Sequence, residues 1–146
     1  MQTLVFNIQI NAPAAKVWHS LWESENYKRW TNVFCAGSYY KMDSFTEGSK
    51  VHFLSPNGGG MYSVVDKIID NQLLVFRHIG ELSNFEEQPI NEQTKHWENA
   101  MEGYELIPTE AGTTLEVKVD TDEKYMDNMK RAFPLALQEL KKIAEG

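Results

Sequence analysis

The sequence predicts an α+β fold in which a curved antiparallel sheet of about six or seven strands wraps around a long C-terminal helix. Three features indicate it: an alternating apolar segment at the start, alternating segments separated by turns in the middle, and a helical apolar stripe at the end. A sheet with one apolar face must be covered, and the last helix is the only expected element of sufficient length. We therefore expect residues 1–146 to form one domain, in which two short helices after the first strand close one edge of the sheet.

The N-terminal part predicts one strand and two short helices. Apolar and polar residues alternate from Leu4 to Ile10, as expected for a strand with one buried face. Pro13 suits the first turn of a helix, and apolar residues four positions apart, Trp22 among them, give that helix one apolar side. Ser24 is the expected N-cap of a second helix that ends near Trp30.

The rest of the chain predicts strands and then the long helix. Turn residues such as those at 56–60 and 109–112 separate the segments. The expected strands cover residues 37–41, 50–55, 61–69, 73–79, 103–108 and 113–120. An apolar stripe with a spacing of three and four runs through the expected helix from about Asp122 to Glu145, and Pro134 is expected to kink it.

Composition and charge restrict the possible partners. A formal net charge of −7 argues against nucleic acid and against an anionic membrane surface, since both require a basic face. No segment approaches the ~20 apolar residues of a membrane span. A single cysteine, Cys35, rules out an internal disulfide, and no leader-like segment opens the chain, so we expect a cytoplasmic protein. No neighbouring residue marks Cys35 as reactive, and we expect a half-buried thiol.

One segment, residues 80–102, is unusually acidic. It holds six glutamates against a single lysine and is long for a connection between strands. Residues 94–101 within it are expected to form a helical turn or two, with Trp97 and Met101 on one side. Two interpretations remain open: a lid over a binding site, or a solvated insertion.

Five motifs in order carry a resemblance to a known family. They are I-x-A-P-x-x-K-V-W-x-x-L from Ile10, G-S-K-V-H-F from Gly48, L-L-V-F-R-H from Leu73, G-T-T-L-E-V from Gly112 and F-P-x-A-L-x-x-L-K from Phe133. The chain resembles, over essentially its whole length, the helix-grip superfamily that includes START lipid-transfer domains, polyketide cyclases and the birch pollen allergen. Within that superfamily it is most similar to the branch of the heat-shock protein 90 ATPase activator C-terminal domain. The motifs are specific for the fold and weak for activity.

The resemblance implies a cavity between the sheet and the long helix that holds a hydrophobic or amphipathic ligand. From the residues alone, the aromatic and methionine side chains on the expected inner faces are more typical of a solid core, and only the resemblance favours a cavity. His78 is likewise more typical of a hydrogen-bonded histidine at the rim of the sheet than of a ligand contact. Of Trp18 and Trp22, one is expected to pack on the sheet edge and the other nearer the cavity mouth, with Trp30 close to the entrance and across from Trp97. The alternative is that Trp18, Trp22 and Trp30 simply pack the short helices onto the sheet. The candidate ligand-binding residues are Trp22, Trp30, Phe53, Tyr62, Phe76, His78, Trp97, Tyr104, Met129 and Phe133.

No motif points to a metal, a cofactor or a catalytic group. The four histidines lack metal-ligand spacing, and the glycines at 58–60 lack the lysine and the helix of a phosphate-binding loop. Acid–base catalysis would need a carboxylate or histidine inside the cavity, and the glutamates of residues 80–102 are expected in solvent. Three functions therefore remain open: a binding protein, a chaperone accessory module, and an enzyme similar to polyketide cyclases. The named activators carry a further N-terminal domain that residues 1–146 do not predict, which weakens the chaperone interpretation.

Overall fold

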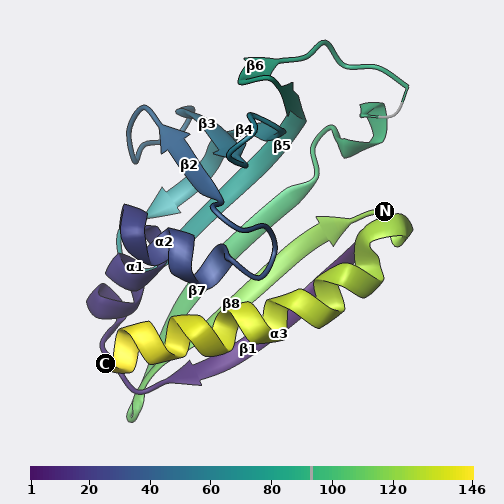
Figure 1. The fold of residues 1–146 in the computed structure, drawn as a ribbon. Helices are drawn as coiled ribbons and strands as arrows, with labels where there is room; N and C mark the ends of the chain where they lie inside the picture. Colours follow the sequence, from purple (N-terminus) through teal and green to yellow (C-terminus); the bar gives the residue numbers. More distant parts are fainter. Residues whose placement is uncertain (93) are drawn as a thin grey trace.

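The computed structural model describes residues 1–92 and 94–146 (Figure 1). The helical elements are α1 (Ala14–Trp22), α2 (Ser24–Thr31), the short 3₁₀ helix η1 (Lys95–Trp97) and α3 (Glu123–Glu145). The strands are β1 (Gln2–Ile10), β2 (Tyr39–Met42), β3 (Lys50–Leu54), β4 (Gly60–Ile69), β5 (Leu73–Ser83), β6 (Glu86–Glu87), β7 (Met101–Thr109) and β8 (Gly112–Thr121).

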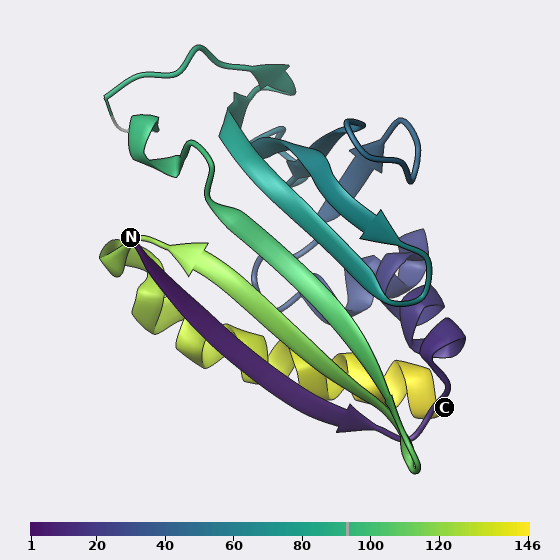
Figure 2. The same cartoon turned by 180° about the vertical axis from the view of Figure 1, so that it is seen from behind.

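The strands form one antiparallel sheet with the order β1-β8-β7-β5-β4-β3-β2, and β6 pairs with the end of β5. The first and last strands are therefore neighbours, which brings the start of the chain beside the start of α3 (Figure 1). All the helices lie on one face of the sheet, and the view from behind shows the opposite face uncovered (Figure 2). The predicted fold, a curved sheet held against a long C-terminal helix, is confirmed.

The short helices differ in one detail from the prediction. Glu23, and not Ser24, caps α2, because its carboxylate accepts the backbone N–H groups of Glu25 and Asn26 at 3.2 and 3.0 Å. The negative charge also suits the positive end of the helix. α1 and α2 pack on the sheet beside α3 and bury Leu21 and Trp30.

The acidic segment is not one continuous loop. Residues 80–83 extend β5, residues 101 and 102 begin β7, and β6 folds back on β5 between them. Of the helical turns expected within residues 94–101, the structure forms one, the short 3₁₀ helix η1. Gln93 lies outside the described residues. The connecting chain passes over the end of the sheet near the start of α3 (Figure 1).

The main core lies between the sheet and the C-terminal half of α3. α3 continues through Pro134, and its buried residues begin at Ala132. Leu140 is fully buried there, as are Leu115 and Val117 of β8. In the described chain, no helix combines the length and the apolar character that crossing a membrane requires. Cys35 is exposed rather than half-buried, because it follows α2 in a surface turn.

Candidate functional site

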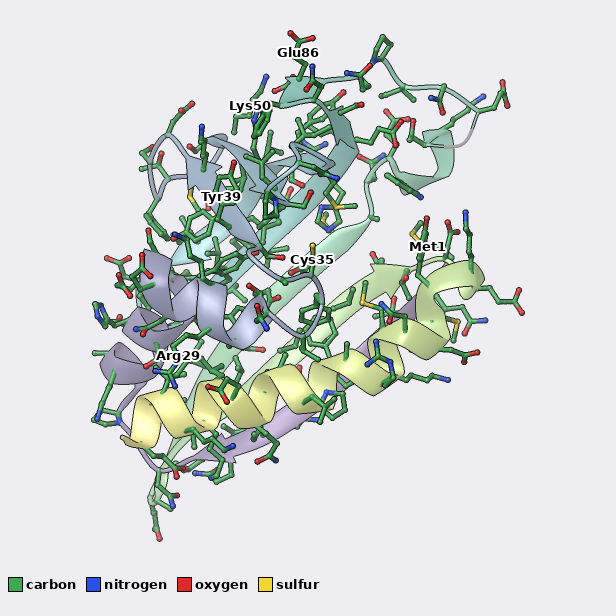
Figure 3. The ribbon with its side chains drawn as sticks, viewed as in Figure 1. Met1, Arg29, Cys35, Tyr39, Lys50 and Glu86 are labelled. Carbon is green, nitrogen blue, oxygen red and sulfur yellow. The ribbon has the colours of Figure 1, made fainter. Side chains whose placement is uncertain are left out.

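Three adjoining hollows lie between α2, the N-terminal half of α3 and the sheet. The central cavity, of about 200 Å³, is partly open and is lined by side chains of α2, β3, β4, β7, α3 and the loop after α2. A hollow of about 360 Å³, the Cys35 hollow, opens toward β2 and β3, and one of about 220 Å³, the Met1 hollow, opens toward the start of α3. Met61 lines all three. Figure 3 labels Cys35 and Met1, which mark the two open sides.

Seven of the ten predicted residues line these hollows. Their side chains come from six different elements, so the fold rather than any one segment brings them together. They are Trp30, Phe53, His78, Trp97, Tyr104, Met129 and Phe133.

The other three predicted residues do not line a hollow. Trp22 is the centre of an aromatic cluster. The ring centroids of its neighbours, Phe76 and Tyr104 among them, lie 5.1–6.5 Å from the Trp22 centroid. Phe76 packs between Trp22 and Phe53 in the same core. These contacts place both side chains in the solid part of the interior.

Tyr62 lies on the opposite face of the sheet. Phe53 is paired with Met61 across β3 and β4, so Met61 shares the inner face and its neighbour Tyr62 points outward. Tyr62 covers Gly80, joins a small outer cluster with Leu82, and donates its hydroxyl to the carbonyl of Gln88 at 3.0 Å. The expectation that Tyr62 faces the cavity assumed the wrong face of β4.

Trp30 and Trp97 occupy different positions. Trp30 is 1% exposed and donates Nε1–H to the carbonyl of Leu21 at 2.9 Å, so it is a fixed wall of the central cavity. Trp97, on η1, is half-buried and lines both outer hollows. Its Nε1 lies 3.3 Å from a carboxylate oxygen of Asp122 at the start of α3. Trp97 therefore covers the open end of the site, whereas Trp30 belongs to its interior.

A chain of polar side chains crosses the inner face of the sheet. Ser63 Oγ lies 2.6 Å from His78 Nδ1, and His78 Nε2 lies 3.3 Å from Glu102 Oε1. The Tyr104 hydroxyl donates to Glu102 Oε2 at 2.5 Å. Ser63 is fully buried, so the exposed end of this network is Glu102, whose side chain is 23% exposed and lines both the central cavity and the Met1 hollow.

The neighbours of Glu102 keep it ionised. Burial raises the pKa of its carboxyl group, but the hydrogen bond and charge of His78, together with the Tyr104 hydroxyl, lower the pKa below the ordinary value of 4.5. Burial and the adjacent carboxylate raise the pKa of Tyr104 well above 10, so the phenol stays a donor. The site thus presents an ionised carboxylate in apolar surroundings.

The sequence did not identify Glu102 as a site residue. Glu102 is the last residue of the acidic segment 80–102, whose glutamates were expected to lie in solvent. One signal could have found it: Glu102 and Tyr104 are two residues apart and so share a face if β7 begins at residue 101. Alternation alone gave no reason to extend the strand across a polar residue.

Glu87 of β6 anchors the connection that carries Trp97. Its carboxylate lies 2.7 Å from His52 Nε2 and 3.0 Å from Lys50 Nζ. The hydrogen bond of His52, followed by that of Lys50, lowers the pKa of Glu87 against the opposing effect of burial. The start of the acidic segment is therefore tied to the outer face of β3 and its end to α3.

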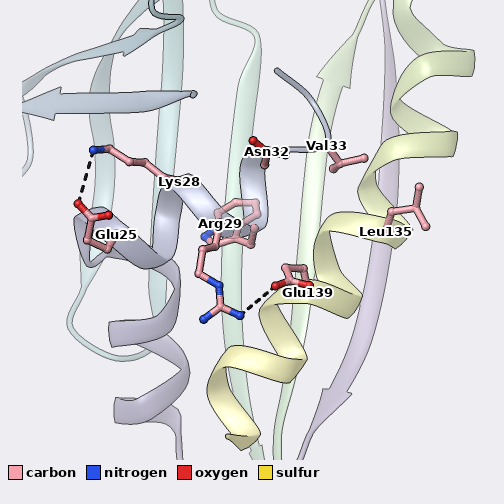
Figure 4. Close-up of a pocket in the computed structure, with 8 residues that line it drawn as sticks. Glu25, Lys28, Arg29, Asn32, Val33, Leu135 and Glu139 are labelled. Carbon is pink, nitrogen blue, oxygen red and sulfur yellow. Dashed lines mark hydrogen bonds and ion pairs between the residues drawn. The ribbon is translucent and has the colours of Figure 1, made fainter. Parts of the chain in front are cut away.

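A separate open groove of about 610 Å³ lies between α2 and α3 (Figure 4). Ion pairs cross or border it, with Arg29 and Glu139 3.0 Å apart and Lys28 and Glu25 3.5 Å apart. Leu135 is 54% exposed beside them. This groove is shallow and charged, unlike the aromatic central cavity.

Comparison with known proteins identifies a family and a fold. A family model described as Activator of Hsp90 ATPase homolog 1-like protein matches residues 11–145. No curated protein sequence matches the chain significantly.

Several solved structures share the fold. A Mesorhizobium loti protein is 17% identical, with a TM-score of 0.74 and coverage of 97% of this chain and 96% of that one. The Aha1 dimer from Colwellia psychrerythraea is 20% identical, with a TM-score of 0.72 over 99% of this chain and 97% of that one. DynU16, from the dynemicin biosynthetic locus, is 14% identical, with a TM-score of 0.68 over 97% of this chain and 46% of that one. At these identities the likeness concerns the fold.

Proposed function

The chain belongs to the family of Activator of Hsp90 ATPase homolog 1-like proteins, and from that premise we propose that it binds a hydrophobic or amphipathic small molecule. In this proposal residues 1–146 act as one cytoplasmic binding domain. The observation that carries it is the central cavity between sheet and α3, which aromatic and methionine side chains line around one carboxylate. Ligand sites in proteins are typically apolar with a few polar groups that orient the guest.

The flexible walls of the cavity support this function. Met61 lines all three hollows and Met129 lines the central cavity and the Met1 hollow, and methionine side chains adapt readily to the shape of a ligand. Rotation of these two side chains would join the hollows into a site large enough for a drug-sized molecule. Trp97 would then lie over the ligand as part of the lid.

The electrostatics of the site favour binding over acid–base catalysis. A general base works best when its pKa lies near the operating pH, whereas the pKa of Glu102 is lowered. Ser63 is fully buried behind His78, so it does not serve as a nucleophile for a guest in the cavity. Glu102 is thus better suited to hold a ligand than to take its proton.

Methionine methyl NMR would test the proposal directly. The full chain labelled with ¹³C-methyl methionine would be titrated with fatty acids, phenylalkanols and aromatic polyketides, after a native mass-spectrometry screen of the same compounds. We expect binders to shift the methyl signals of Met61 and Met129. Met101, which lies on the outer face of the sheet, is the internal control. A screen without binders, or binders that shift only Met101, would contradict the proposed function.

The second candidate is contact with a chaperone. Leu135 offers exposed apolar surface in the groove between α2 and α3, and the family takes its name from an Hsp90 activator. A pull-down with the Hsp90 of the same organism tests it. Retention that Leu135→Asp abolishes would support this function, and the absence of retention by the wild-type chain would remove it.

A further inference from the structure

We propose that the ligand of the central cavity carries a neutral hydroxyl group, which Tyr27 and Glu102 bind between them. In this arrangement the Tyr27 hydroxyl donates a hydrogen bond to the ligand oxygen, and the ligand donates its own O–H to the Glu102 carboxylate. This inference rests on the proposed function. It adds Tyr27 as a binding residue and gives the chemical class of the ligand, an alcohol or phenol with an apolar body.

The first argument is the uncommitted hydroxyl of Tyr27. This residue is 8% exposed and lines both the central cavity and the Cys35 hollow. Its ring is fixed by Trp22, Trp30 and Tyr40, whose ring centroids lie 4.8–6.4 Å away. The hydroxyl has no hydrogen-bond partner among the described residues. A largely buried hydroxyl without a partner costs free energy, which a ligand with an acceptor atom would recover.

The second argument is that the other donors of the cavity are already used. Among the described residues that line it, each further side-chain N–H or O–H group donates to an acceptor within the protein. These groups are the indole N–H of Trp30 and the hydroxyls of Thr31, Ser38 and Tyr104. The donor that remains for a ligand is therefore the Tyr27 hydroxyl.

The third argument is the acceptor capacity of Glu102. Each carboxylate oxygen accepts up to two hydrogen bonds, and each has one described donor, His78 for Oε1 and Tyr104 for Oε2. These donors already stabilise the negative charge, so a ligand needs to supply a hydrogen bond and not a positive charge. Glu102 lines the same cavity as Tyr27. Burial, followed by the charge of Glu102, raises the pKa of Tyr27 above its ordinary value of 10, so Tyr27 stays a donor at neutral pH.

One donor and one acceptor on the same cavity select the polar group of the ligand. A hydroxyl group donates and accepts through a single oxygen, whereas an ether only accepts. A carboxylate ligand would be repelled by Glu102, and the described residues that line the cavity include no lysine or arginine to pair with it. The site therefore favours a hydroxyl over the anion of a fatty acid.

Three probes with one body and different ends test the inference: 4-phenylbutan-1-ol, its methyl ether and 4-phenylbutanoate. Each would be titrated into the full chain at neutral pH, with the methyl shifts of Met61 and Met129 as the readout, because both side chains line the cavity. We expect the alcohol to bind about tenfold or more tightly than the ether, since only the alcohol donates to an ionised carboxylate. The carboxylate should bind most weakly.

Tyr27→Phe removes the hydroxyl, keeps the ring and breaks no hydrogen bond of the described structure. We expect the alcohol and the ether to lose about fivefold in affinity together, because both accept from Tyr27. The preference for the alcohol over the ether should persist. Tyr39→Phe is the matched control, since Tyr39 lines the Cys35 hollow and not the central cavity, and it should bind all three probes as the wild type does.

Glu102→Gln keeps the shape of the side chain and removes its charge. We expect the preference for the alcohol over the ether to fall to about threefold or less, and the carboxylate probe to bind more tightly than it does to the wild type. Glu105→Gln is the matched control, because Glu105 is an exposed carboxylate of the same strand. It should retain the full preference.

The outcomes separate the two proposals. Equal binding of alcohol and ether by the wild-type chain, or unchanged affinities in Tyr27→Phe, would overturn the assignment of the hydroxyl and leave the binding function standing. Binding of none of the three probes would count against both. Should Glu102→Gln fail to fold, the wild-type comparison and Tyr27→Phe still decide.

Discussion

The two halves of α3 contact the sheet in different ways. All six residues that are buried in this helix, as the structure describes it, lie at or beyond Ala132, and most are alanine or leucine. The N-terminal half contributes Met129, which is half-buried and lines the central cavity. Small and aliphatic side chains allow close packing on the strands, whereas long flexible ones leave space that can be refilled. One helix thus anchors the fold toward its C-terminal end and borders the binding site toward its N-terminal end, and Phe133 between them is both buried and part of the cavity wall.

The aromatic side chains show the same division. Trp22 and Phe76 fill the interior beside the aliphatic core, whereas Trp30, Phe53 and Tyr104 reach the cavity. The boundary between solid core and site therefore runs through the aromatic cluster.

The largest effect is expected in the anchoring half of α3. Leu140→Ala should lower the free energy of unfolding by about 3 kcal/mol, because Leu140 is fully buried among tightly packed neighbours. Chemical denaturation followed by circular dichroism measures it, with the exposed Gln138→Ala as the control. A loss below about 1 kcal/mol would show that this half is not the anchor.

The next largest effect on stability is expected at two buried tryptophans, of which only Trp30 has a hydrogen-bond partner in the described structure. Trp30→Phe should cost about 2 kcal/mol, because it also leaves the Leu21 carbonyl without its donor. Trp22→Phe should cost about 1 kcal/mol, since Trp22 Nε1 is buried without a hydrogen-bond partner among the described residues. Denaturation of both variants gives the difference. An equal or larger cost for Trp22 would mean that its indole N–H is satisfied in solution, for example by a buried water.

In the cavity half, Met129→Ala should cost about 1 kcal/mol or less, because the residue is half-buried at a surface that is not filled. Its main effect should be on ligand affinity, which the probe titrations measure. A stability loss close to that of Leu140→Ala, with unaltered binding, would remove the distinction between the two halves of the helix.

The smallest effect is expected in acid. Because the folded chain lowers the pKa of Glu102 below 4.5, the ionised carboxylate stabilises the fold above that pH, and this contribution is lost as the pH falls through the lowered value. His78 and Tyr104 are the titratable groups that lower its pKa, and the charge of Glu102 in turn raises the pKa of Tyr27. The difference in melting temperature between wild type and Glu102→Gln should therefore shrink as the pH falls from about 5 to about 3. A difference that stays constant over this range, while Glu105→Gln matches the wild type, would contradict the lowered pKa.

Much of the fold follows from local patterns. Alternation of apolar residues predicts β1, β3, β4, β5, β7 and β8, and the apolar stripe predicts α3, because strand and helix periodicities depend only on neighbouring residues. Two features escaped such patterns: β6 is too short to alternate, and the cap of α2 comes from Glu23 although Ser24 is the more usual residue.

The sequence by itself determined the fold class, the covering helix and five of the eleven residues that line the central cavity. Only the tertiary structure decided which side of β4 faces inward, because strand pairing places Met61, and not Tyr62, beside Phe53. A shift in register between Tyr62 and Ser63 then sets Ser63 opposite His78. The assembled sheet also brings Glu102 to His78 and Tyr104 and encloses it beneath α3. The face to which a strand side chain points depends on pairing with residues far away in the chain. A carboxylate becomes part of a binding site only when elements distant in the sequence pack around it and exclude water.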